Sequence, residues 1–245
     1  HRKRSRHDGT ATDIDSRFGT TFRCSSSHLN LMRDTGRKNP PPGSYSTVER
    51  RALLPIRQFG SGLCYPLVRL LATLGIPATA ISLSQIPLGF LAAILIVRAP
   101  QAACLLFFLA IFLDFLDGEV ARATSTDSAF GALVDQASDH VREITLVGGL
   151  VAGGQLRGEI GVAYALAYPL SNFLLYLADR SQAPVTFSVK TWMLFYPGLI
   201  AFCWSSINVL DHVILLTAGL LAVAGAQALL KIRRATSGKG TDFGV

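Results

Sequence analysis

Charged residues are scarce in this sequence. They make up 16% of the 245 residues, whereas hydrophobic residues make up 50%. A soluble globular domain usually carries about 25% charged residues. The shortage is concentrated after residue 75, where long apolar stretches dominate. It argues against a water-soluble domain for most of the chain and indicates that a lipid bilayer surrounds it.

The sequence also lacks the spacings that cysteine-based sites require. Its four cysteines, Cys24, Cys64, Cys104 and Cys203, form no CxxC or Cys/His metal pattern, so we expect small buried hydrophobic side chains. The net charge is +7, placed mostly at the chain ends and in loops, without an aromatic-plus-basic RNA motif. We therefore expect no nucleic-acid partner and instead contact with anionic lipid headgroups.

The chain divides into four parts. Residues 1–44 are polar, mixed in charge and without apolar periodicity, which predicts a disordered tail. Residues 45–75 mix arginines with apolar residues and predict an interfacial amphipathic helix, with a soluble packing helix as the alternative. Residues 76–235 are expected to form the membrane domain, and 236–245 a C-terminal tail.

Six apolar segments follow the interfacial helix, several of them close to the ~20 residues that span a bilayer. They lie near residues 79–98, 101–121, 129–152, 160–178, 191–209 and 212–230. Basic residues are concentrated at both ends of the chain and in alternate loops, which predicts cytoplasmic termini. We expect an all-α, multi-pass integral membrane protein with six transmembrane helices and an active site that faces the cytoplasm.

The second and third segments carry an unusual group of acids. Asp114 and Asp117 are three residues apart and share one helix face, and Asp135 and Asp139 are four apart and share another. The connection at 123–128 is short and polar, so the two acidic faces are expected to meet in a hairpin. Asp127 or Ser128 could cap the second helix.

Four ionised aspartates inside spanning helices would cost several kcal/mol and repel one another. A hard divalent cation removes both problems, because carboxylate oxygens suit Mg²⁺. Gly118 and Gly131 leave room for a bulky ligand, and Arg122 supplies a positive fork for phosphate. The alternative is helix packing through acid–arginine pairs, but the one or two nearby arginines would leave acidic charge uncompensated.

The spacing D-x-x-D-G-x-x-A-R-x(8)-G-x-x-x-D-x-x-x-D runs from Asp114 to Asp139 with no element missing. It resembles the motif of the CDP-alcohol phosphotransferase family, whose members have an interfacial helix followed by six spans. Eight defined positions at defined spacing make this a specific match. The resemblance covers residues ~46–235.

The resemblance implies a role for each residue of the motif. Asp114, Asp117 and Asp135 would be metal ligands, and Asp139 would complete a two-metal site or act as the base. The residues expected to line the CDP pocket are Gly118, Ala121, Arg122 and Gly131. Thr79 and Ser82 align loosely with a Pro-Asn-x-x-Thr-like element of the family, with Thr79 in place of Asn and Ser82 in place of Thr. The family also implies two Mg²⁺ or Mn²⁺ ions and a homodimer.

The predicted reaction moves a phosphatidyl group from a CDP-linked lipid such as CDP-diacylglycerol to an alcohol and releases CMP, with Asp139 as the general base. Arg142 is a candidate for binding an acceptor phosphate, and an ion pair with Glu143 or another helix is its alternative. Two other functions would also place acids in spans: a metal-dependent intramembrane prenyltransferase and a divalent-cation transporter. The prenyltransferase acids usually lie in two separate loops, and a transporter does not need this pattern of glycine and arginine.

Overall fold

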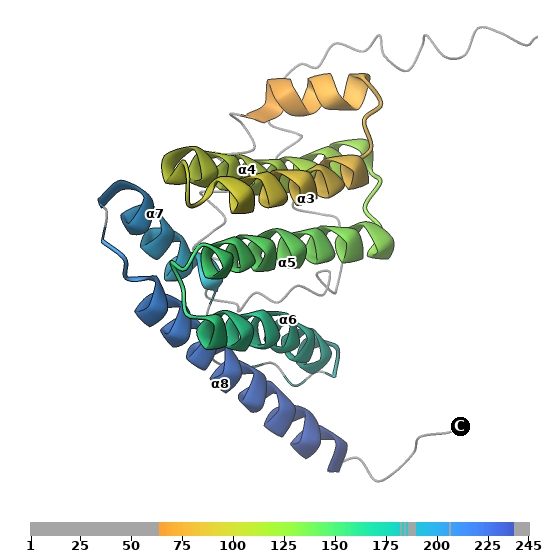
Figure 1. Ribbon diagram of the computed structural model, residues 1–245. Coiled ribbons are helices and arrows are strands. Elements are labelled where there is room, and N and C mark those ends of the chain that lie inside the picture. Colours follow the sequence, from red (N-terminus) through yellow and green to blue (C-terminus); the bar gives the residue numbers. More distant parts are fainter. Residues whose placement is uncertain (1–63, 182, 184, 186–189, 206, 238–245) are drawn as a thin grey trace, which may run out of the picture. The chain divides into compact units, whose positions relative to one another are not determined.

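The computed structural model describes residues 64–181, 183, 185, 190–205 and 207–237. Every regular element in this part of the chain is a helix, which confirms the all-α prediction for it (Figure 1). Within the expected interfacial segment, residues 64–73 are helical. The predicted tail at 1–44 and the remainder of the interfacial segment, 45–63, lie outside the described residues.

Five of the six expected apolar segments are single helices. They are α3 (Ala78–Leu95), α4 (Pro100–Thr124), α5 (Ala129–Ala152), α6 (Gly158–Arg180) and α8 (Leu210–Ser237). The segment expected near 191–209 differs, because it consists of a 3₁₀ turn, η2 (Thr191–Met193), and the short helix α7 (Phe195–Ser205). The 11 residues of α7 rise about 17 Å, less than the ~30 Å hydrocarbon core of a bilayer.

Three helices of the described part of the chain are long and apolar enough to cross a membrane. They are α3, α6 and the Leu210–Ala235 part of α8. Helices α4 and α5 contain 25 and 24 residues, but the acidic residues lower their hydropathy. The composition of these helices indicates a membrane protein, whereas the count of six spans stays a prediction.

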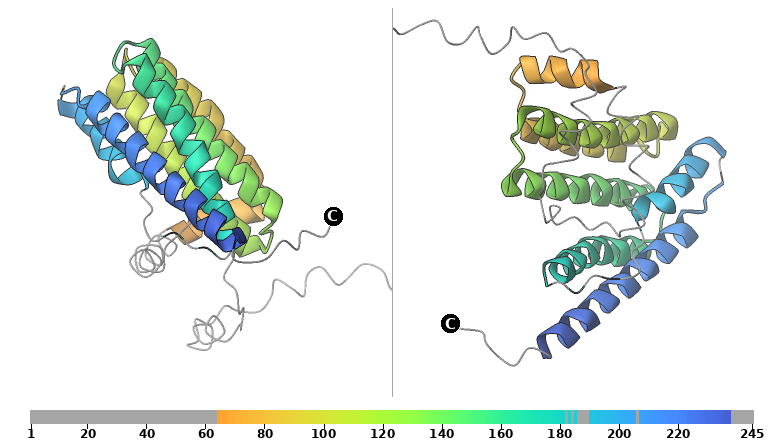
Figure 2. Two further views of the ribbon diagram at one scale, coloured as in Figure 1. Left: turned by 90° about the horizontal axis from the view of Figure 1, so that it is seen from below. Right: turned by 180° about the vertical axis from the view of Figure 1, so that it is seen from behind.

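Helix α5 lies between the α3–α4 pair and α6, and α8 crosses α6 (Figures 1 and 2). The approach of α3 to α5 depends on small residues, as is common between membrane helices. A Cβ atom added to Gly149 would lie 2.5 Å from the backbone oxygen of Ala93, so only glycine fits this contact. The absence of a side chain at Gly149 therefore allows α3 and α5 to pack closely.

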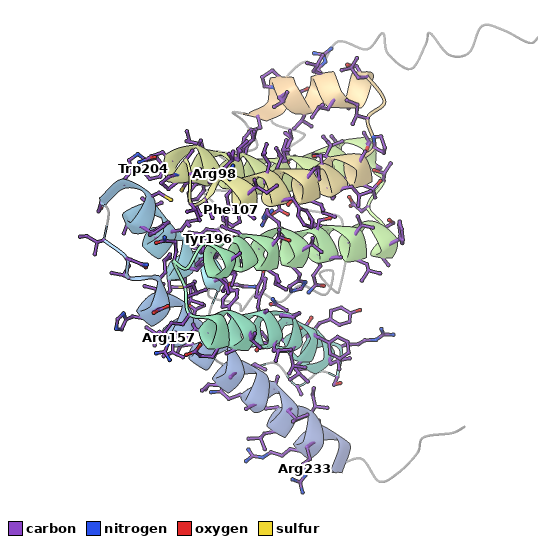
Figure 3. All side chains as sticks on the ribbon, in the orientation of Figure 1. Arg98, Phe107, Arg157, Tyr196, Trp204 and Arg233 are labelled. Atoms are coloured by element: carbon purple, nitrogen blue, oxygen red, sulfur yellow. The ribbon has the colours of Figure 1, made fainter. Side chains whose placement is uncertain are left out.

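Aromatic side chains connect α4 with α7. The ring of Phe107 meets that of Tyr196 edge to face, with centroids 5.4 Å apart and planes at 87° (Figure 3). Phe195 packs against Phe107 as well, at 6.4 Å between ring centroids. Both contacts belong to a buried cluster that includes Leu146 and Leu150 of α5. The short helix α7 is thus attached to the core that supports α5.

Candidate active site

The turn between α4 and α5 is closed by local hydrogen bonds. Ser125 ends α4 in the left-handed conformation (φ 54°), and its N–H donates to the backbone oxygens of Ala121 and Arg122. Ser128 begins the next helix, and its hydroxyl accepts a 2.9 Å hydrogen bond from the N–H of Gly131. The N-cap prediction is confirmed for Ser128. The tight link brings the two acidic faces together.

Three of the four aspartates converge. Asp114, Asp117 and Asp135 each offer a carboxylate oxygen, and these three oxygens lie within 4.8 Å of one another. Asp117 is buried and the other two are half-buried. Asp139 lies one helical turn beyond Asp135 and is not a member of this group of three. The arrangement matches a carboxylate site for a divalent cation, with the fourth acid adjacent.

The residues present fit such a cation. The Oδ1 atom of Asp135 is buried and finds no hydrogen-bond donor among the described residues. A buried carboxylate oxygen without a donor is costly, because it has lost water and gained nothing in exchange. A hard oxygen-seeking cation such as Mg²⁺ or Mn²⁺ would supply the missing partner.

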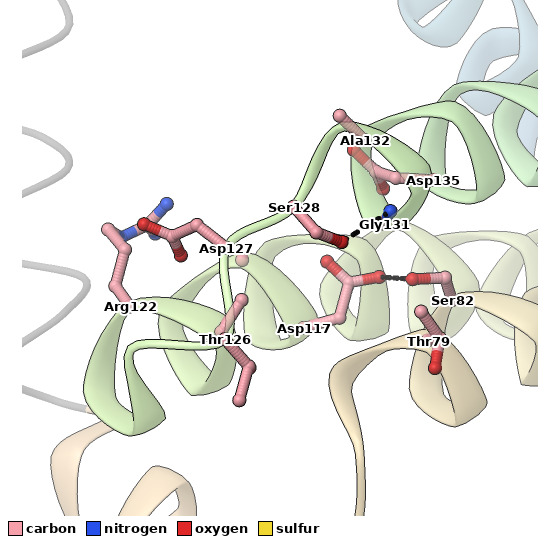
Figure 4. Close-up of a pocket in the computed structure, with 12 residues that line it drawn as sticks. Thr79, Ser82, Asp117, Arg122, Thr126, Asp127, Ser128, Gly131, Ala132 and Asp135 are labelled. Carbon is pink, nitrogen blue, oxygen red and sulfur yellow. Dashed lines mark hydrogen bonds between the residues drawn. The ribbon is translucent and has the colours of Figure 1, made fainter. Parts of the chain in front are cut away.

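A cavity of about 150 Å³ opens beside the acids, and Figure 4 shows the side chains around it. Every residue expected to contact the nucleotide lines this cavity: Thr79, Ser82, Gly118, Ala121, Arg122 and Gly131. Asp117 and Asp135 line it too. Six of the eight motif residues and the polar residues at the start of α3 therefore surround one space, and Asp114 and Asp139 lie outside its lining.

Four further lining residues were not expected to contact a ligand: Thr126, Asp127, Ser128 and Ala132. Three of them belong to the turn between the helices, where a role was predicted only for Asp127 or Ser128, as a helix cap. Their closeness to the motif along the chain was the signal that could have identified them.

Two residues expected to contact the nucleotide have protein partners. The hydroxyl of Ser82 donates a 2.6 Å hydrogen bond to Oδ2 of Asp117, so Ser82 contacts the acid cluster as well as the cavity (Figure 4). Arg122 pairs with Glu119 at 2.6 Å, and 41% of the Arg122 side chain is exposed. An exposed pair of this kind is worth little, so Arg122 is available to a phosphate at small cost.

Arg142 is buried rather than open to the cavity. Its side chain is 3% exposed, and Nη2 lies 2.8 Å from Oδ1 of Asp139. Its Nη1 donates a hydrogen bond to the side-chain oxygen of Gln85. The geometry corresponds to the ion-pair alternative, although the partner is Asp139 and not Glu143.

Glu143 belongs to a separate buried network. Its carboxylate accepts hydrogen bonds from the hydroxyl groups of Tyr164, Tyr196 and Thr191, which come from α6, α7 and η2. Its side chain has no exposed surface. Because its described partners are these hydroxyl groups of the protein, Glu143 connects α5 to its neighbouring helices.

Comparison with known proteins decides the family. The sequence profile of the CDP-alcohol phosphatidyltransferases matches residues 74–226, which includes the whole motif. The chain belongs to this family. Membership favours a phosphatidyltransferase over the prenyltransferase and cation-transporter alternatives.

Two curated relatives show local similarity. The phosphatidylinositol phosphate synthase of Mycobacterium marinum is 33% identical over 84 residues, which is 33% of this chain and 36% of that protein. The archaetidylinositol phosphate synthase of Pyrococcus horikoshii is 39% identical over 49 residues, or 20% of this chain and 26% of that protein. The matched stretches thus span about a third or less of each relative.

Solved structures share the fold over a longer range. The phosphatidylinositol phosphate synthase of Mycobacterium tuberculosis in complex with manganese and citrate aligns with a TM-score of 0.58 at 15% identity, covering 69% of this chain and 88% of that one. The same enzyme with CDP-DAG bound aligns with a TM-score of 0.50 at 13% identity, covering 70% and 90%. At these identities the likeness establishes a common fold.

Proposed function

We propose that this protein is a metal-dependent phosphatidyltransferase that moves a phosphatidyl group from a CDP-linked lipid to an alcohol and releases CMP. One observation carries the proposal: the carboxylates of Asp114, Asp117 and Asp135 converge beside a cavity that is lined by the two glycines, the alanine and the arginine of the motif. A metal site next to a cavity with a phosphate-binding arginine suits a diphosphate ligand.

Asp114, Asp117 and Asp135 would hold one divalent cation, and Asp139 would share in holding a second. We expect Mg²⁺ or Mn²⁺, since the donor atoms are all carboxylate oxygens. When bound, the ions supply positive charge that stabilises the diphosphate and the departing CMP. The manganese in the related Mycobacterium tuberculosis structure supports this choice of ions.

The cavity would hold the cytidine diphosphate part of the donor. Gly118 and Gly131 have no side chain, so a ligand can approach the backbone of both helices. Arg122 would exchange Glu119 for a phosphate oxygen, which accepts two parallel hydrogen bonds from a guanidinium group. Thr79 and Ser82 add hydroxyl groups from α3.

Asp139 would act as the general base. It takes the proton of the acceptor hydroxyl while the hydroxyl oxygen forms a bond to the phosphorus of the phosphatidyl group. The bond from that phosphorus to the CMP oxygen breaks, and CMP leaves with the electron pair. Arg142 stabilises the ionised form of Asp139 before the proton is taken, because its positive charge lies 2.8 Å away.

We expect the acceptor to be a polyol phosphate, with inositol phosphate as the first candidate. Both curated relatives are named as inositol phosphate lipid synthases. The donor would be CDP-diacylglycerol, which is bound in one related structure. The basic residues at the chain ends support an active site and termini on the cytoplasmic side, and the family resemblance supports a homodimer.

A substrate panel tests the proposal. The full chain would be purified in detergent and mixed with CDP-diacylglycerol, Mn²⁺ or Mg²⁺, and one alcohol at a time: inositol phosphate, glycerol phosphate, serine or inositol. We expect release of CMP together with a lipid product for one of these acceptors. No CMP release with any acceptor, from protein that is folded and binds Mn²⁺, would contradict the proposed function.

A further inference from the structure

Gln85 is a buried polar residue in the middle of the apolar helix α3. Its side chain has no exposed surface, and it lies outside both the acidic motif and the lining of the cavity. Helix α3 has a mean hydropathy of 1.7, so its natural surroundings are apolar. Burying an amide without hydrogen bonds is unfavourable, so the groups that bond to Gln85 indicate why it is there.

The partners of Gln85 all belong to the acidic site. Its side-chain nitrogen donates to Oδ1 of Asp114 and to Oδ2 of Asp117, both at 3.4 Å. Its side-chain oxygen accepts from Nη1 of Arg142. A single amide therefore contacts two of the three converging carboxylates on one side and the buried guanidinium group on the other.

The chemistry of these partners determines how the amide is oriented. The nitrogen can only donate and the oxygen can only accept. Turning the amide over would direct its oxygen at two carboxylates and its nitrogen at a guanidinium group, and both contacts would be repulsive. A glutamine with this orientation is thus matched to an anionic partner on one side and a cationic partner on the other.

A close helix contact brings Arg142 within reach. Gly89 lies one turn beyond Gln85 on α3, and a Cβ atom there would lie 3.0 Å from the Cα of Arg142. Without a side chain at this point, α5 approaches α3 and its arginine reaches the amide. Arg142 then contacts Gln85 with one nitrogen and Asp139 with the other.

We propose that Gln85 is a positioning residue that orients both parts of the acidic site. Its nitrogen holds the metal-ligand carboxylates of Asp114 and Asp117, and its oxygen holds Arg142 in the place where it pairs with the base, Asp139. This inference rests on the proposed function for the roles of metal and base. Groups that orient metal ligands from behind affect metal affinity by about tenfold to a hundredfold.

The first test compares Gln85→Met with Ser84→Ala. Methionine keeps the unbranched length of glutamine but makes neither hydrogen bond. Ser84 is next to Gln85 on α3 and bonds only to the backbone oxygen of Ile81, among the described contacts, so it is a matched control. Titration of MnCl₂ into the purified full chain without substrate should give about tenfold weaker binding in Gln85→Met and unchanged binding in Ser84→Ala.

A second variant addresses the case in which Gln85→Met fails to fold. Gln85→Glu keeps an acceptor for Arg142 but replaces the donor with an anion beside two carboxylates. The metal-free protein should melt at a lower temperature than the wild type, and Mn²⁺ should raise its melting temperature by more. A side chain that only fills space would give all folded variants the same response to Mn²⁺, and that result would overturn the proposal.

Activity measurements separate this inference from the proposed function. If the wild type releases CMP and Gln85→Met matches it in turnover and in Mn²⁺ affinity, the positioning role is wrong and the function stands. If the wild type transfers to no acceptor while Mn²⁺ binding still depends on Gln85, the function is wrong and the positioning role stands.

Discussion

Arg142 and Asp139 form an ion pair within one turn of α5, with 2.8 Å between Nη2 and Oδ1. The arginine side chain is 3% exposed and the aspartate side chain 29%. The guanidinium group of the pair is therefore buried, whereas the aspartate side chain is still partly exposed. This polarity suits a carboxylate that must receive a proton and an arginine that does not contact the substrate.

Replacing Arg142 with Lys should lower kcat by up to about a hundredfold, the low end of a general-base contribution, while KM for the acceptor stays constant. A lysine amino group cannot contact both Asp139 and Gln85 in the way a guanidinium fork does. Steady-state kinetics with varied acceptor would measure both constants. Arg157→Lys is the control, because Arg157 pairs with Glu159 at the exposed surface. A raised KM with constant kcat would instead support direct binding of the acceptor by Arg142.

Replacing Asp139 with Asn should reduce kcat at least about a hundredfold, because the amide cannot take the proton of the acceptor hydroxyl. The variant should still fold but melt at a lower temperature, because the buried Arg142 loses its charged partner. Turnover measured well below that melting temperature therefore reports the loss of chemistry and not unfolding. CMP release and thermal melting would be measured on the same preparation. Asp179→Asn removes an exposed carboxylate of α6 and should have no effect. Unimpaired turnover in Asp139→Asn would exclude the base assignment.

Replacing Ser82 with Ala removes the 2.6 Å hydrogen bond to Asp117. The Mn²⁺ concentration for half-maximal activity should rise about tenfold, since the ligand loses a group that orients it. Thr79→Val is the companion variant, because Thr79 lines the same cavity and does not hydrogen-bond the acid cluster among the described contacts. It should raise KM for the CDP-linked donor and leave the Mn²⁺ dependence unchanged. If Ser82→Ala instead raised KM for the CDP-linked donor and left the Mn²⁺ dependence unchanged, Ser82 would contact the nucleotide and not orient the metal ligand.

Replacing Gly149 with Ala should destabilise the protein by about 1–3 kcal/mol, the usual cost of inserting a methyl group into a packed interface. The new Cβ would lie 2.5 Å from the backbone oxygen of Ala93, and α3 and α5 would have to separate. Gly148→Ala is a matched control on the same helix, with no atom within 4 Å of the added Cβ. It should leave stability unchanged or raise it by up to about 1 kcal/mol. Unfolding by denaturant in detergent micelles would measure both. Equal stability of the two variants would show that the interface adapts without cost.

Much of the helical framework could be predicted from local features. Apolar runs of about 20 residues predicted the bounds of α3, α4, α5 and α6 to within three residues, because helix formation in an apolar setting depends on the segment itself. Helix α8 was also predicted, but it ends seven residues beyond the apolar run, at Ser237. The cap at Ser128 was also visible, since a serine three residues before Gly131 acts within one turn. The segment that became η2 and α7 was not predicted, because its hydropathy resembles that of a span and its break depends on contacts with α4 and α8.

In the acidic site, too, some features follow from local sequence and others only from the packing of the helices. Spacing alone determined that Asp114 and Asp117 share a face and that Asp135 and Asp139 share another, since helix geometry relates residues three and four apart. The family resemblance already implied that Asp114, Asp117 and Asp135 act together as ligands. Only the tertiary structure decided how Arg142 is used and that Gln85 joins the acids. Gln85 is 29 residues from Asp114 and 57 from Arg142, and no local rule relates residues so far apart. The packing of α3 against α4 and α5 brings them together, because glycines at the contact allow the helices to approach closely.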